Sequence, residues 1–441
     1  MAIPANKMGQ LQALFSALSE KHRQTLVMTI LAAKADGEPK LPYDDLLTLL
    51  GCADAVPQED RWEEIFSVVK PLVVEKARRC DQISATLLHD VWEYYLRELD
   101  PVRAAAWLSG KETLADIRAA MVAAYRELME TKKGRNTLIK KFGEDEQAQL
   151  SILLSLMNRS DELEDFFGGW ADNIKNLDDE NLAPLREFNE HLIVESPEIT
   201  PYVLFLVASR LLHPFQVFRA VEKVTGHSND RVMIKTELKV VGDALLDQND
   251  IWLNDFKWER NQKCDPDQSV ASLKNFIDLT NGWLSEFEVD PAGAWGKRLS
   301  AQRSRCGKVW DEHMQRIQKM VDRVLPRKRG SVTGRQTMPD IKRDVVENDI
   351  VLMENAITLL LGARSYASQG GFQSSRDKLV QMLESRIEEQ SEDLLALLGQ
   401  ERDDYEQISA HFAVLVRIVK QYQGDKEANV LSRRSVAAMA A

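Results

Sequence analysis

Apolar side chains recur every three or four residues along most of this chain, which is the spacing of one face of an α-helix. The series after Ser84, a typical N-cap residue, runs Leu87, Leu88, Val91, Trp92, Tyr95. The sharpest series lies near the C-terminus and runs Val346, Ile350, Met353, Ile357, Leu360. No segment alternates between apolar and polar residues for long enough to require a strand. The sequence therefore predicts an all-α fold.

Polar segments that contain Gly or Pro interrupt this periodicity and predict a multi-module helical protein. The segment Thr131 to Asn136 has the composition of a connection, and PRKRGSVTGRQTMP after Leu325 that of a linker. After the linker, three helical series joined by short loops predict an antiparallel bundle with coiled-coil-like seams. The expected parts are an N-terminal helical module (1–130), a central helical module (136–325), a basic flexible linker (326–339), a C-terminal helical bundle (340–424) and a tail (425–441).

The composition is that of a globular protein. The chain has 441 residues, of which 44% are hydrophobic, and its net charge is −12. Such a balance excludes disorder over most of the length, and the negative charge makes binding of nucleic acid over the whole surface unfavourable. The four cysteines lie far apart, so neither a zinc site nor a disulfide framework is expected. We expect no signal peptide or transmembrane segment, and hence a cytoplasmic protein.

Charge is concentrated in two segments. Residues 297–335 contain twelve bases and three acids, whereas residues 381–410 contain nine acids and two bases. The two segments could pair within the fold or across a dimer, the basic one could bind an external anion, or its bases could simply be solvated. The candidate binding residues of the basic segment are Arg298, Arg303, Arg305, Lys308, Arg316, Lys319, Arg327, Lys328 and Arg329.

Catalytic motifs are largely missing from the sequence. It contains no GxxxxGK[ST], GxGxxG, GxSxG, HExxH or ExxH motif. The adjacent pair His89-Asp90 is of the kind that helical metal phosphohydrolases use, and His22 and Asp116 could complete its ligand set. The alternative is that His89 and Asp90 lie on an outer helix face. We expect no cofactor.

Two further groups of polar residues suggest sites. Asp243, Asp247 and Asp250 lie on one helical face and could share a cation such as Mg²⁺, although a hydrated polar face explains them as well. Arg210 and His213 fall in the most apolar stretch of the chain. A charged group in such a stretch requires a partner, so a buried ion pair, a core histidine or a ligand pocket are the interpretations.

These observations favour a non-enzymatic cytoplasmic helical adaptor or scaffold that acts by protein–protein interaction. Apolar seams would supply affinity and charged segments would supply steering, and self-association into a homo-oligomer is expected. One alternative is a binder of nucleic acid or of an anionic membrane surface through residues 297–335. The other is a metal-dependent helical hydrolase centred on His89-Asp90.

Overall fold

The computed structural model describes residues 61–440 except 76, 78, 80, 109, 259–264, 330–336 and 401–402, together with Leu11, Leu26, Ile30 and Leu46. These residues are mostly helical and contain few strands, so the all-α prediction is confirmed. The other residues before Arg61, among them the candidate ligand His22, lie outside the described residues. Within the described part of the chain, no helix has the length and apolar character needed to cross a membrane.

The described residues form two compact units. Unit 1 lies within Met1–Leu212 and Arg219–Gly226, and unit 2 lies within His213–Phe218 and His227–Ala441. The bounds of these units do not coincide with those of the modules expected from the sequence, and the modules stay a prediction. The segment that we interpreted as a connection begins a helix instead, because Thr131 is a helix N-cap whose hydroxyl accepts a hydrogen bond from the amide of Gly134 at 2.9 Å.

Unit 1 consists of short helices and one pair of two-residue parallel strands, β1 (Val73–Val74) and β2 (Ile83–Ser84). The predicted N-cap is confirmed, because Ser84 accepts a hydrogen bond from the amide of Leu87 at 3.1 Å. The helices are α4 (Arg61–Ile65), α5 (Ala85–Tyr94), α6 (Pro101–Leu108), α7 (Leu114–Glu130), α8 (Lys132–Phe142), α9 (Glu144–Asn158), α10 (Ser160–Gly168), α11 (Asp179–Glu195) and α12 (Thr200–Arg210), with 3-10 helices η1 (Ser67–Leu72) and η3 (Pro197–Ile199) and the π-helix η2 (Tyr95–Leu99).

The most apolar stretch of the sequence is not one continuous helix. Helix α12 ends at Arg210, and the 3-10 helix η4 (Pro214–Gln216) and helix α13 (Val217–Thr225) follow it. The break agrees with the position of Pro214, since the residue before a proline is disfavoured in the helical conformation. His213 accordingly has the extended backbone angles φ −120° and ψ 94°.

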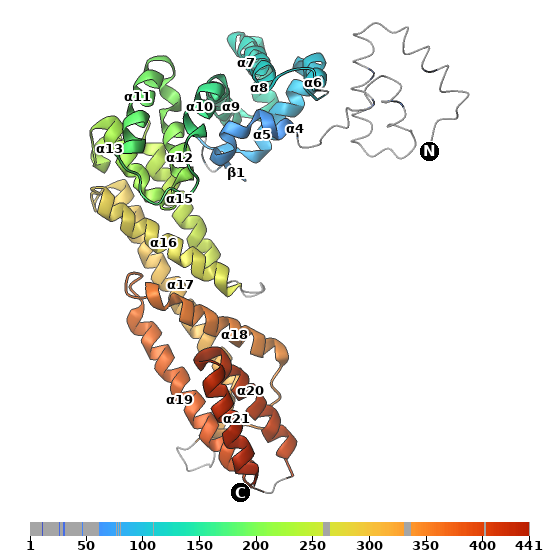
Figure 1. Cartoon of the computed structure of the whole chain (residues 1–441), viewed down its shortest axis with the longest axis vertical. Coiled ribbons are helices and arrows are strands. Elements are labelled where there is room, and N and C mark those ends of the chain that lie inside the picture. Colours follow the sequence, from blue (N-terminus) through green and yellow to red (C-terminus); the bar gives the residue numbers. More distant parts are fainter. Residues whose placement is uncertain are drawn as a thin grey trace. The chain divides into compact units, whose positions relative to one another are not determined.

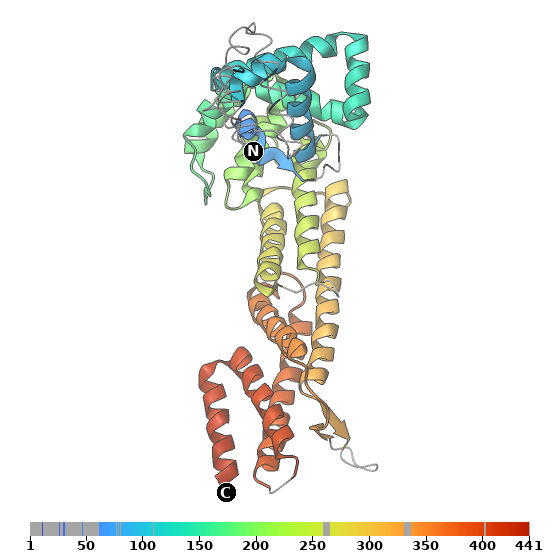
Figure 2. The same cartoon turned by 90° about the vertical axis from the view of Figure 1, so that its right-hand side faces the viewer.

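Unit 2 contains the long helices. Its helices are α14 (Asp230–Met233), α15 (Lys239–Phe256), α16 (Pro266–Glu286), α17 (Ala294–Val324), α18 (Glu347–Gly362), the 3-10 helix η5 (Ala363–Tyr366), α19 (Gln373–Leu398), α20 (Tyr405–Gln423) and α21 (Asp425–Ala440). Helices α15, α16 and α17 run side by side, and α19, α20 and α21 pack against one another (Figures 1 and 2).

One hydrophobic core extends through these helices, from Leu253 in α15 to Leu431 in α21. The segment 326–339 does not separate two cores: its described ends form the antiparallel strands β3 (Arg327–Arg329) and β4 (Thr337–Pro339). The segment 425–441 differs from a tail, because α21 buries Ala428 and Leu431 in that core. Strand β4 contacts α19, and α21 contacts α19 and α20, so both segments pack within unit 2.

Candidate functional site: interaction surfaces of the two units

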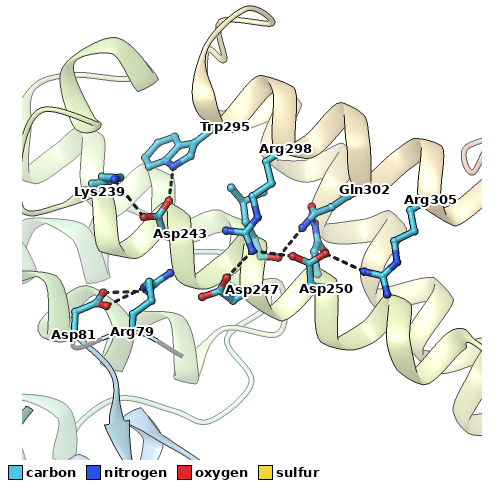
Figure 3. A network of polar contacts seen from close by, with 12 residues as sticks. Arg79, Asp81, Lys239, Asp243, Asp247, Asp250, Trp295, Arg298, Gln302 and Arg305 are labelled. Atoms are coloured by element: carbon cyan, nitrogen blue, oxygen red, sulfur yellow. Dashed lines mark hydrogen bonds and ion pairs between the residues drawn. The ribbon is translucent and has the colours of Figure 1, made fainter. Parts of the chain in front are cut away.

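The N-terminal half of the basic segment pairs with the aspartate row in unit 2. Arg298 of α17 donates hydrogen bonds to Asp247 at 2.5 Å and to Asp250 at 2.8 Å. Arg305 also lies 3.4 Å from Asp250, and the indole of Trp295 donates to Asp243 at 2.8 Å. Figure 3 shows these side chains of α15 and α17 facing one another, and we call them the polar seam.

The polar seam explains both the row of aspartates on α15 and the facing arginines on α17 without a bound cation. Burial opposes the charge of Arg298, but the hydrogen bonds of Asp250 and Asp247 raise its pKa. Behind the seam, Gln302 donates to the carbonyl of Leu246 at 2.7 Å, and Asn249 donates to Thr280 at 3.3 Å. The aspartates are therefore neither a hydrated face nor an open Mg²⁺ site, since Arg298 and Arg305 pair with Asp247 and Asp250, and Asp243 accepts from Trp295 and lies 3.9 Å from Lys239.

The C-terminal half of the basic segment is partly used as well. Arg327 donates to Asp393 of α19 at 2.6 Å and lies 3.6 Å from Glu389, so pairing between the basic and acidic segments occurs within unit 2 at this point. Arg316 donates to the carbonyl of Trp258, and Lys328 lies 3.3 Å from Asp340. The candidate residues that are exposed and form no ion pair with a described residue are Arg303, Lys308, Lys319 and Arg329.

The suggested pocket at Arg210 and His213 is not tested by the structure. Arg210, in unit 1, forms an ion pair with Asp172 and remains about one-third exposed. His213 belongs to unit 2 and its ring lies 5.6 Å from that of Phe215. The partner that a charged group in this apolar stretch requires is therefore present for Arg210.

The His89-Asp90 pair lies on an exposed part of α5. The two side chains are 59% and 50% exposed, and their nearest nitrogen and oxygen are 3.8 Å apart. Within the described ranges, no group of three His, Cys, Asp or Glu side chains could hold a metal ion. The outer-face interpretation therefore accounts for both residues as the structure describes them.

The structure reveals an acidic surface in unit 1 that the sequence analysis missed. Residues 161–198, which include most of α10, the following connection and all of α11, contain twelve acids and two bases. The rings of Phe166 and Phe188 stack at 4.2 Å, and Trp170 lies 5.7 Å from Phe166. All three rings are half-buried, and exposed carboxylates such as Asp165 and Glu187 are next to them in sequence. We call this the acidic–aromatic surface; counting charge along the sequence could have found it.

Helix α8 carries a basic surface on the same unit. Its inner side is fixed by Leu138, which is fully buried, and by Phe142, whose ring packs on Tyr94 at 5.7 Å. Gly143 ends the helix with φ +108°, a conformation that favours glycine. The outer side presents five exposed bases and no acid: Lys132, Lys133, Arg135, Lys140 and Lys141. None of them forms an ion pair with a described residue, although three acids begin α9.

Comparison with known proteins does not identify the chain. It matches no protein-family model, no curated protein and no solved structure. Its function therefore has to be argued from its own surfaces, among which the acidic–aromatic surface and α8 carry exposed charge of opposite sign on one compact unit.

Unit 2 also contains a cavity of about 750 Å³ beside α19, α20 and α21. The Tyr422 hydroxyl at its wall donates to Glu384 at 2.8 Å, and burial, with the nearby Glu384, raises the pKa of Tyr422 to about 12. Arg376 is buried and donates to the carbonyl of Leu360 at 3.2 Å. The lining carries both signs of charge, so its electrostatics favour neither an anion nor a cation.

Proposed function

We propose that the protein is a non-enzymatic helical adaptor or scaffold that acts in the cytoplasm by binding other protein chains. The observation that carries this proposal is the acidic–aromatic surface, where Phe166, Trp170 and Phe188 are half-buried beside exposed carboxylates. Aromatic side chains are enriched among the residues that dominate binding energy in protein interfaces. The surrounding acids would select basic partners and accelerate their encounter.

The alternative functions receive less support. Binding of nucleic acid or an anionic membrane through residues 297–335 would need free cations, but Arg298, Arg305, Arg316, Arg327 and Lys328 contact partners within unit 2. The hydrolase hypothesis would need a ligand set around His89-Asp90, and the described residues supply none. Protein binding needs only surfaces that the described residues already form.

A matched set of captures tests the proposal. The full chain, the double variant Asp165→Lys/Glu187→Lys and the control Lys308→Glu/Lys319→Glu would each be used as bait in an extract of the native host. We expect the wild type and the control to capture the same host proteins. The acidic-surface variant should capture at least tenfold less of these proteins. All four substituted residues are exposed and have no ion pair with a described residue, so the fold should persist. Equal capture by all three baits would contradict the proposal.

A further inference from the structure

We propose that α8 of one copy of this chain binds the acidic–aromatic surface of a second copy, so that the protein self-associates head to tail through unit 1. This inference rests on the proposed function and names the partner. The two surfaces are formed by different elements, α8 and the pair α10 and α11. One such contact leaves one α8 and one acidic–aromatic surface free, so it generates a ring or an open filament unless both contacts form between the same two copies, which closes a two-fold dimer.

Unsatisfied charge on both surfaces is the first argument. The five bases of α8 are all exposed and lack ion-pair partners among the described residues. Asp165 and Glu187 on the acidic–aromatic surface are equally exposed and equally without such partners. By contrast, Arg298 of the polar seam and Arg327 of β3 are paired with nearby acids. Other acids of residues 161–198 pair with bases of unit 1, as Glu164 does with Arg118 and Asp179 with Lys223. Asp165 and Glu187 are therefore the acids of this surface that we expect to complement the bases of α8.

The chemistry of the two surfaces is the second argument. Lys133 and Lys140 are seven residues apart, or about two turns, and so project from the same side of α8. Lysine and arginine side chains bind the faces of aromatic rings when they approach within about 6 Å of the ring centre, and nearby carboxylates strengthen the attraction. The Phe166, Phe188 and Trp170 cluster supplies such faces and Asp165 supplies a carboxylate next to it.

The test is the mass of the purified full-length protein in solution, measured by sedimentation velocity from low to high salt. We expect wild-type protein to self-associate at low salt and to dissociate as salt rises, because the screening length falls to about 3 Å at 1 M salt. Lys133→Glu/Lys140→Glu and Asp165→Lys/Glu187→Lys should each weaken association at least tenfold. The quadruple variant, which combines these four substitutions and so exchanges the charges of the two surfaces, should restore association. The control Lys308→Glu/Lys319→Glu should associate like the wild type.

The outcomes separate this inference from the proposed function. A wild type that is monomeric at all concentrations and salts would overturn self-association, as would association that neither charge reversal weakens. If such a monomer binds a lysine-rich peptide and Asp165→Lys/Glu187→Lys abolishes that binding, the acidic–aromatic surface serves a different basic partner. If such a monomer instead binds a polyanion such as heparin through α8, the variant Lys133→Glu/Lys140→Glu should lose this binding. The bases of α8 would then bind an external anion, and self-association through α8 would be contradicted.

Discussion

His313 illustrates how a single buried residue sets a pH dependence. Its ring packs between Phe256 and Trp258 and its Nε2–H donates to the Phe256 carbonyl at 2.8 Å. Burial is the main cause that lowers the pKa of His313 to about 4; the hydrogen bond to the Phe256 carbonyl opposes it, the charge of Arg316 adds to it, and the charge of Glu312 opposes it. The folded protein therefore binds this proton less readily than the unfolded chain does, whose histidine pKa is about 6.5.

We predict that unit 2 loses stability as the pH falls from about 6.5 to about 4, because protonation of His313 then favours the unfolded chain. Within this pH range, His313 changes the free energy of unfolding by about 1.4 kcal/mol per pH unit. His313→Gln should reduce that slope while keeping a donor for the Phe256 carbonyl. The measurement is the free energy of urea unfolding at several pH values. An unchanged slope in the variant would show that other groups cause the acid sensitivity.

At the scale of elements, α15 and α17 are joined by charge as well as by apolar packing. Arg298 is about one-third exposed at its side chain, while Asp247 and Asp250 are 14% and 24% exposed. Losing the cation would remove a hydrogen-bond donor from both carboxylates and leave Asp250 with the longer contact to Arg305, which costs more than losing a surface ion pair. The polar seam therefore fixes how these two helices pair along their length.

We predict that Arg298→Met lowers the free energy of unfolding by about 1 to 2 kcal/mol. Adding Asp247→Asn and Asp250→Asn should recover part of this loss, because these substitutions remove the two carboxylate charges that lost Arg298 as a partner. Arg303→Met is the matched control on α17, since Arg303 is exposed and forms no ion pair with a described residue, and it should change stability by less than about 0.5 kcal/mol. Equal effects of the two arginine variants would rule out a stabilising seam.

At the scale of the whole molecule, the extent of each core defines the units. The core of unit 2 reaches α21, where Leu431 is 6% exposed and Ala428 is 4% exposed. Val436 on the same helix is 65% exposed and lies outside that core. Helix α21 is thus amphipathic, and its burial makes the end of the sequence part of unit 2.

We predict that Leu431→Ala destabilises unit 2 by about 2 to 3 kcal/mol, because it removes buried apolar volume. Val436→Ala, on the exposed side of α21, should change stability by less than about 0.5 kcal/mol. Thermal and urea unfolding of the full chain measure both effects. Identical unfolding of the two variants would mean that α21 does not pack on the core as described.

Local patterns predicted much of the secondary structure. The Ser84 cap and the helical series from Val346 to Leu360 follow from spacing and from short-range backbone preferences. Thr131 is the informative failure: its segment is polar enough for a loop, but its hydroxyl caps a helix. Polar composition alone does not distinguish a loop from the first turn of an exposed helix.

The partners of the charges could not be predicted in the same way. The sequence by itself determined the helical character and the positions of the charged segments, because periodicity and composition are local properties. Only the tertiary structure decided that Arg298 pairs with Asp247, 51 residues away, that Arg327 pairs with Asp393, and that α8 and the acidic–aromatic surface remain exposed. The physical reason is that an ion pair depends on a few ångströms of separation, which the packing of distant helices sets.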